Sequence, residues 1–191
     1  MKATVIILLL ALLALAAMTV WQRGRFRPEE TSMTDATTGQ SSSVLRGPLA
    51  LEIVSDTWFN SPALTSADLR GKVVLVEFWT FGCFNCRNVL PSLKSWHDKY
   101  RDQGLVVVSI HSPEFTYEHD VANVRRAITD LSIPYPVALD NDFKIWKSYN
   151  VRAWPTWFVL DKQGTIRYSH VGEGAYAETE QMIRALLKEQ S

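Results

Sequence analysis

The sequence predicts an α/β domain in which helices flank a central mixed β-sheet, with a transmembrane helix and a linker preceding the domain. Two apolar runs, residues 73–79 and 105–110, are rich in β-branched residues, which is typical of strands buried on both faces. A helical pattern follows each run, and a helical crossover makes such strands parallel. Two later apolar segments joined by a tight turn predict an antiparallel hairpin, so the sheet is mixed.

Composition divides the chain into three parts. Residues 3–20 carry no charge and would form a helix about 27 Å long, close to the roughly 30 Å of a bilayer core. We therefore assign residues 1–21 to a signal-anchor transmembrane helix, residues 22–48 to a flexible linker poor in large apolar residues, and residues 49–191 to the folded domain. A cleaved signal peptide is the alternative, because Ala14-Leu15-Ala16 resembles a cleavage site.

The folded domain is expected to run strand–helix–strand–helix and then hairpin–helix. Apolar residues recur at helical spacing after each early strand, and the last helix has acidic residues in its first turn and Lys188 near its end, as the helix dipole favours. The expected elements after the first strand are a helix over 84–102, the strand 105–110, a helix over 121–131, a short helix near Asp142, hairpin strands at 157–160 and 165–171, and a helix over roughly 176–189.

Charge and cysteine content limit the possible functions. Lys+Arg and Asp+Glu both number 20, so the net charge is zero. Phosphate binding needs a basic excess, and we therefore expect no nucleic-acid partner. The chain has only two cysteines, three positions apart, whereas a disulfide-stapled module would spread more of them along its sequence.

The two cysteines lie in the motif Cys83-Phe84-Asn85-Cys86, directly after the first buried strand and at the expected start of a helix. Unpaired N–H groups and the helix dipole stabilise a thiolate at such a position, and the thiolate is the nucleophile in disulfide exchange. Cys86 is one turn further on, so its sulfur can reach Cys83 and resolve a mixed disulfide. We expect Cys83 to be the exposed attacking cysteine and Cys86 the buried resolving one.

A zinc half-site is the alternative interpretation of this motif. A structural zinc ion usually has four ligands, often two Cys pairs or one pair with two closely spaced histidines. The sequence has no second Cys pair, His111 and His119 are further apart than that spacing, and His97 and His170 are isolated. We therefore expect neither a metal nor another cofactor.

Glu77 interrupts the most hydrophobic strand, six positions before Cys83. A carboxylate in such a strand is destabilising unless it is paired or neutral, and burial raises its pKa towards neutrality. A group of this kind suits the proton acceptor for Cys86. The alternative is an edge position that faces solvent.

Several longer motifs accompany the cysteine pair. They are residues 76–86, Pro91, Trp154-Pro155-Thr156, and further segments at 58–62, 69–72, 111–115, 135–142 and 172–176. Together they resemble the thioredoxin superfamily and, more narrowly, the TlpA-like redoxins and the thioredoxin-like region of DipZ-type proteins, over roughly residues 56–189. The resemblance implies a thioredoxin-like fold and thiol–disulfide oxidoreductase activity at the CxxC motif.

The resemblance also implies roles for individual residues. Pro155 would be the cis-proline beside the Cys83–Cys86 disulfide, and Trp154 would offer backbone groups to an extended substrate strand. Glu77 falls at the buried acid position of the family, and Pro91 falls where the helix after the cysteines is kinked.

Two positions depart from the pattern of many thioredoxins. Gly82 stands before the first cysteine, where many members have Trp, and Phe84-Asn85 replaces Gly-Pro between the cysteines. Both positions lie next to the reactive sulfur, so we expect Phe84 and Asn85 to contact substrate and both sites to tune the redox poise.

The cellular setting also follows from the resemblance, which implies a membrane-anchored domain outside the bacterial cytoplasm, in the periplasm. The flanking charges do not decide the orientation, because Lys2 precedes the apolar run and three arginines follow it. We expect an enzyme that reduces disulfides of exported proteins and receives electrons from a membrane thiol protein. A redoxin-type thiol peroxidase and a redox-inert binding module on the same scaffold are the alternatives.

Overall fold

The computed structural model describes residues 49–50 and 52–190. The expected transmembrane helix (1–21) and linker (22–48) lie outside these residues, so both assignments remain predictions. Within the described part, no helix has both the length and the apolar character needed to cross a bilayer.

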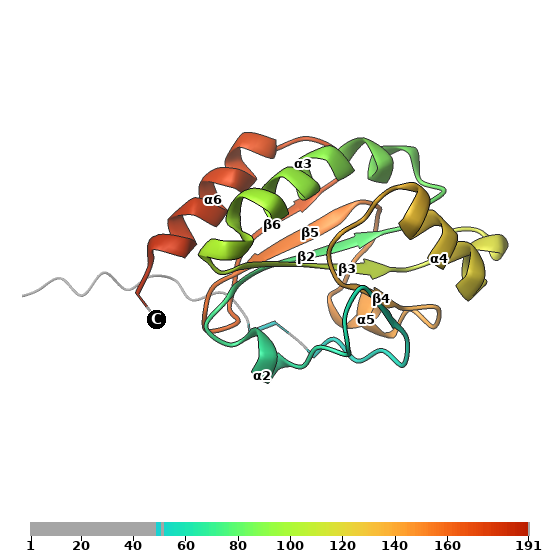
Figure 1. Cartoon of the computed structure of the whole chain (residues 1–191), viewed down its shortest axis with the longest axis horizontal. Coiled ribbons are helices and arrows are strands. Elements are labelled where there is room, and N and C mark those ends of the chain that lie inside the picture. Colours follow the sequence, from blue (N-terminus) through green and yellow to red (C-terminus); the bar gives the residue numbers. More distant parts are fainter. Residues whose placement is uncertain (1–48, 51, 191) are drawn as a thin grey trace, which may run out of the picture. The chain divides into compact units, whose positions relative to one another are not determined.

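A six-stranded mixed sheet forms the centre of the domain, with the strand order β1-β4-β3-β2-β5-β6 (Figure 1). The parallel pairs are β2 with β3 and β3 with β4, whereas β1 with β4, β2 with β5, and β5 with β6 are antiparallel. The strands are β1 (Trp58–Phe59), β2 (Val73–Trp79), β3 (Leu105–His111), β4 (Val137–Leu139), β5 (Thr156–Leu160) and β6 (Ile166–Val171).

Helices cover both faces of this sheet. Figure 1 shows α3 and α6 side by side on one face, and α2 and α5 on the other. The helices are α2 (Ser66–Leu69), α3 (Phe84–Tyr100), α4 (Val121–Asp130), α5 (Lys144–Ser148) and α6 (Tyr176–Lys188), and two 3₁₀ turns are η1 (Arg101–Gln103) and η2 (Thr116–His119).

Successive side chains of a strand point to opposite faces of a sheet, so β2 contributes to two cores. Leu75 and Trp79 pack with α3, α4 and α6, whereas Val76 and Phe78 pack with α5 on the opposite face. Every residue of β2 is buried, as predicted for a strand covered on both sides.

The predicted architecture of a mixed sheet with flanking helices is confirmed, and the expected elements differ from the observed ones by at most two residues at their ends. The sequence analysis missed β1, β4 and α2. These elements have two, three and four residues, which is too short for hydrophobic periodicity to reveal them. β4 also directly follows Pro136, a residue that usually indicates a loop.

Candidate active site

Cys83 is the N-cap of α3, in the loop that leaves the end of β2. Its Sγ accepts a hydrogen bond of 3.3 Å from the backbone N–H of Cys86, one of the donors that the first helical turn leaves without an intrahelical partner. Cys83 is half-buried and Cys86 is 0% exposed, and both thiols are free. Cys83 lies at the start of a helix and Cys86 is buried, as expected, but Cys83 is half-buried instead of exposed, and the chemical roles of both remain predictions.

Cys86 lies in the core beneath Cys83. Burial raises the pKa of the Cys86 thiol well above its ordinary value, and the nearby Cys83 sulfur and Glu77 act in the same direction. Such a thiol stays protonated at neutral pH. Because the thiolate is the reactive form, Cys86 needs an acceptor for its proton before it can attack.

Glu77 lies in the middle of β2 and is completely buried, so the alternative of a solvent-facing edge position is wrong. Its Oε2 accepts a hydrogen bond of 2.5 Å from Ser109 Oγ. Burial raises the pKa of Glu77 from 4.5 to about 8, and the hydrogen bond from Ser109 opposes this rise. A pKa close to neutrality allows a carboxyl group to accept and return a proton in the physiological range.

The peptide bond between Trp154 and Pro155 is cis, as the resemblance implied. Because β5 runs antiparallel to β2 with Thr156 opposite Phe78, the start of β5 lies beside the end of β2. The cis peptide bond is therefore close to the point where the cysteine loop begins. The Trp154 indole Nε1 donates to Ser112 O at 3.0 Å. Among residues 49–50 and 52–190, no hydrogen bond uses the Trp154 backbone, so its N–H and C=O are available to an extended chain.

Glu118 is a buried residue of the site that sequence reasoning missed. Its carboxylate accepts hydrogen bonds from the N–H groups of Gly82 (2.6 Å), Glu114 (2.6 Å) and Phe115 (2.8 Å). It therefore fastens the cysteine loop to the segment 113–119. Glu118 stands three residues after Phe115, the spacing of a capping box, but no Ser or Thr accompanies it at the N-cap position to make that signal readable.

The contacts of Glu118 explain why residue 82 is glycine. A Cβ at this position would lie 2.6 Å from Glu118 Oε1, 2.7 Å from Tyr117 Oη and 3.2 Å from the Phe115 ring. A larger residue therefore cannot fit unless the segment 113–119 moves. The departure from Trp at this position is thus a packing requirement, and its expected effect on redox poise remains a prediction.

Aromatic side chains border the cysteine loop. Phe84, which follows Cys83, is 75% exposed, and Tyr117, which lies against Gly82, is 52% exposed. The rings of Phe115 and Tyr117 are stacked with centroids 5.7 Å apart. Exposed aromatic groups of this kind are common where one protein contacts another. Asn85 is also exposed, so both residues between the cysteines can reach a substrate.

The histidines near this site do not assemble a metal centre in the described part of the chain, where no group of three His, Cys, Asp or Glu side chains is placed to hold an ion. His111 is completely buried and stacks on Phe81, with the ring centroids 5.5 Å apart. Burial lowers the pKa of His111 to about 4, so it is neutral at physiological pH.

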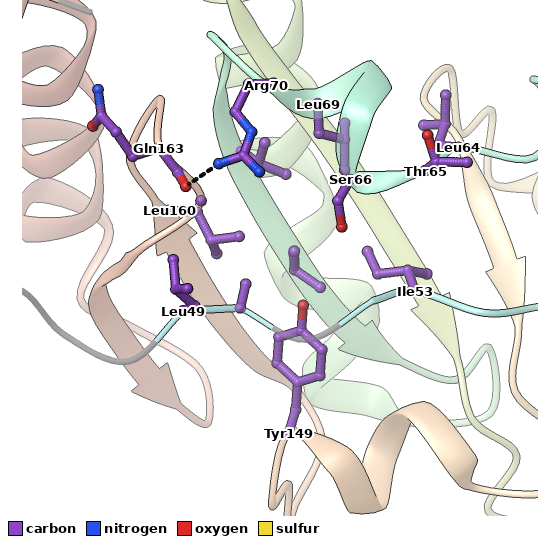
Figure 2. Close-up of a pocket in the computed structure, with 14 residues that line it drawn as sticks. Leu49, Ile53, Leu64, Thr65, Ser66, Leu69, Arg70, Tyr149, Leu160 and Gln163 are labelled. Carbon is purple, nitrogen blue, oxygen red and sulfur yellow. Dashed lines mark hydrogen bonds between the residues drawn. The ribbon is translucent and has the colours of Figure 1, made fainter.

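An apolar cavity of about 120 Å³ lies on the other face of the sheet (Figure 2). Val74 and Val76 of β2 line it, and the Arg70 guanidinium donates to Gln163 O at 3.0 Å at its rim. None of the predicted site residues lines this cavity. Cys86 and Glu77 lie on the side of β2 that faces α3, whereas the Trp154 ring also contacts Trp146 of α5, with the ring centroids 4.4 Å apart.

Comparison with known proteins identifies the family to which this chain is similar. Residues 58–169 match the AhpC/TSA family, which is more than half of the chain. Protein DipZ of Mycobacterium tuberculosis is 41% identical over 135 residues, a match that covers 69% of this chain and 19% of DipZ. This chain therefore spans about a fifth of the length of that relative.

Two further relatives are matched over nearly their whole length. The thiol-disulfide oxidoreductase YkuV of Bacillus subtilis is 26% identical, with 76% of this chain and 97% of YkuV covered. The crystal structure of a thiol-disulfide isomerase from Corynebacterium glutamicum is 27% identical, with 75% of this chain and 98% of that chain covered and a TM-score of 0.68. The resemblance inferred from the motifs is confirmed, and the chain belongs to the AhpC/TSA family as a thioredoxin-like member whose homologues include thiol–disulfide oxidoreductases.

Proposed function

We propose that this protein is a thiol–disulfide oxidoreductase, tethered to a bacterial membrane, that reduces disulfides of exported proteins outside the cytoplasm. The observation that carries the proposal is the placement of three groups: a half-buried cysteine at the start of α3, a buried thiol beneath it and a buried carboxyl within β2. They are Cys83, Cys86 and Glu77. The names of YkuV and of the isomerase relative support the same reaction class.

The reaction has two exchange steps. The Cys83 thiolate attacks one sulfur of the substrate disulfide, forms a mixed disulfide, and releases the second substrate sulfur as a thiolate that takes a proton from solvent. Cys86 then gives its proton to Glu77, and its thiolate attacks Cys83 Sγ. The Cys83–Cys86 disulfide forms and the bond from Cys83 to the substrate breaks. The substrate sulfur leaves as a thiolate that takes a proton, which returns Glu77 to its starting state, and the substrate is reduced by two electrons overall.

Substrate would bind as an extended segment beside Cys83. The backbone groups of Trp154, next to Pro155, have no hydrogen-bond partner among the described residues and offer hydrogen bonds to such a segment. Phe84 and Asn85 on one side, and the ring of Tyr117 on the other, offer contacts to its side chains.

The cellular setting rests on the first part of the sequence. The uncharged residues 3–20 are long enough for a single membrane pass, and residues 22–48 would let the domain reach substrates. Each turnover leaves Cys83 and Cys86 oxidised. Two electrons are needed to restore the dithiol, and we propose a membrane thiol protein as their source.

Cysteine trapping tests the reaction. The full-length Cys86→Ser and Cys83→Ser variants are expressed in a bacterial host, and mixed disulfides are detected on non-reducing gels. Cys86→Ser should accumulate mixed disulfides through Cys83, because the resolving step is lost, and Cys83→Ser should accumulate none. Equal trapping by both variants, or none by Cys86→Ser, would overturn the assignment.

The Cys86→Ser variant also tests the cellular location of the domain. Cys86→Ser leaves Cys83 as the one cysteine of the chain, so a membrane-impermeant maleimide should label it in intact spheroplasts if the domain lies outside the cytoplasm. Labelling only after lysis would reverse the proposed orientation.

The reduction potential of the Cys83–Cys86 pair, measured in glutathione or dithiothreitol buffers, decides the direction of electron flow. A value near about −270 mV, like that of thioredoxin, supports a reductant, whereas a value near about −120 mV would make the protein a disulfide donor.

A further inference from the structure

Two buried polar atoms near the proposed proton acceptor have no hydrogen-bond partner within the described part of the chain. They are Glu77 Oε1 and Tyr135 Oη, and both side chains are 0% exposed. Buried polar atoms are normally hydrogen-bonded, because an unpaired one is destabilising. The two side chains share one neighbour, because Ser109 lies close to both Glu77 and Tyr135.

The backbone places Tyr135 next to the partner of Glu77. The Ser109 N–H donates to Pro136 O at 2.9 Å, and Ser109 lies opposite Val137 in the ladder. Tyr135 is two residues before Val137, so it lies on the face of the sheet that carries Ser109 and Glu77. The Tyr135 backbone is itself held, because its carbonyl accepts a hydrogen bond of 3.0 Å from Asn60 Nδ2.

The side chain of Tyr135 lies under α3, where its ring meets the edge of the His97 ring with centroids 5.7 Å apart. It belongs to the same core cluster as Cys86 and Trp79. Burial raises the pKa of Tyr135 well above its ordinary value, the negative charge of Glu77 adds to this rise, and the nearby Ser109 hydroxyl opposes it. The hydroxyl is therefore a firmly protonated donor within electrostatic reach of the carboxyl.

Other polar groups share this face of the sheet in the described part of the chain, and Trp79 Nε1 and His111 Nδ1 are also buried without a hydrogen-bond partner. The elements packed around it present the Cys86 thiol from α3, His111 two residues beyond Ser109 on β3, and the indole of Trp157 from β5. The Trp157 Nε1 already donates to Thr179 at 3.1 Å. Within the described part of the chain, no Lys or Arg contributes to the shift of the Glu77 pKa.

We propose that Ser109 and Tyr135 are positioning residues for Glu77, with the Ser109 hydroxyl on Oε2 and the Tyr135 hydroxyl donating to Oε1 when the carboxyl ionises. The carboxylate then has a donor on each oxygen at the moment when it can accept the Cys86 proton. After the transfer, the Glu77 carboxyl is neutral and no longer needs a donor on each oxygen. This inference rests on the proposed function, because it concerns the resolving step.

Ellman's reagent separates the two steps in the full-length reduced protein, purified in mild detergent. Attack by Cys83 releases one coloured thiolate, and attack by Cys86 on the resulting mixed disulfide releases the second. Across the neutral to alkaline range, the first phase should be the same in wild type, Tyr135→Phe and Ser109→Ala. In both variants, the midpoint of the pH dependence of the second-phase rate should move to higher pH by about one pKa unit. At neutral pH the second phase should therefore be about tenfold slower than in wild type.

Tyr149→Phe is the matched control, because Tyr149 is a buried tyrosine on the opposite face of the sheet. It should keep the wild-type profile. Carbon NMR of the Glu77 carboxyl should show a higher pKa in Tyr135→Phe than in wild type or Tyr149→Phe. A merely structural role would lower the unfolding free energy without moving either midpoint.

The possible failures are distinguishable. An unchanged midpoint in Tyr135→Phe, by kinetics and by NMR, overturns the role of Tyr135. A wild-type protein that releases only one equivalent of coloured thiolate contradicts the proposed exchange reaction instead.

Discussion

The two faces of the sheet bury different chemistry, although the same strands build both. On the face under α3, β2 and β3 carry the polar side chains Glu77, Ser109 and His111 among apolar residues, and all three are 0% exposed. On the opposite face the same two strands carry only aliphatic and aromatic side chains, and an apolar cavity lies against them. Within β2 and β3, polar groups are buried only on the side where Cys86 lies.

This difference indicates what the polar face is for. Burying a carboxyl group is destabilising, and the apolar face shows that these strands can be covered without one. A departure from an apolar core that is confined to one side, beside a reactive thiol, is typical of a functional site. Variants that add a carboxyl to the apolar face, remove it from the polar face or change the packing on either side therefore test this difference.

Placing a carboxyl on the apolar face should have the largest effect. Val76→Glu puts a charge among aliphatic side chains with no Ser109 equivalent opposite, because Val108 is its ladder partner. We expect a loss of at least about 5 kcal/mol in the free energy of unfolding, enough to leave the domain largely unfolded. Chemical denaturation measures this loss, with Val76→Leu as the control for size. Similar stabilities for the two variants would show that the faces do not differ.

Removing the natural carboxyl should change how stability depends on pH. The pKa of Glu77 is raised from 4.5 to about 8 in the folded protein. Its contribution to stability is therefore fully present below about pH 4.5 and is lost as the pH rises towards 8, because the unfolded chain ionises first. The loss is about 1.4 kcal/mol per pH unit, or about 3 kcal/mol between pH 5 and pH 7.

Glu77→Gln should abolish this slope, so its unfolding free energy should fall less than that of wild type over the same range. Urea denaturation at several pH values makes the comparison, with Glu114→Gln as an exposed control. Parallel curves for wild type and Glu77→Gln would show that Glu77 ionises normally in the folded protein.

Crowding the cysteine loop should have an intermediate effect. Gly82→Ala forces a Cβ against Glu118 Oε1 and Tyr117 Oη, and overpacking of this kind costs about 1–3 kcal/mol. The loss should be smaller when Glu118→Ala is already present, because the nearest contact is then gone. A double-mutant cycle by thermal or chemical unfolding measures the coupling between the two positions. Additive losses would contradict the close contact between Glu118 and residue 82.

Filling the cavity should have the smallest effect. Val74→Ile adds one methylene group to the apolar lining, which should change the unfolding free energy by less than about 1 kcal/mol. It should leave both phases of the reaction with Ellman's reagent unchanged. A slower second phase in this variant would show that the apolar face is coupled to the exchange chemistry.

The parts of the site that could be predicted from sequence are those encoded within a short stretch of chain. The positions of Cys83 and Cys86 followed from a buried strand that runs directly into a helix, and the burial of Glu77 followed from the apolar run around it. Pro155 needed the family resemblance, since most X–Pro bonds are trans. In each case neighbouring residues carry the signal, because strand and helix periodicity are local properties of the chain.

Contacts between distant segments were decided only by the tertiary structure. Glu118 meets Gly82 across 36 positions, and Ser109 meets Glu77 across 32. Tyr135 reaches the same centre because the short strand β4, invisible as a pattern, pairs beside Ser109. Such contacts depend on strand order and register, which follow from the packing of the whole sheet. A local sequence pattern therefore identifies the reactive groups, and the folded sheet determines which side chains support them.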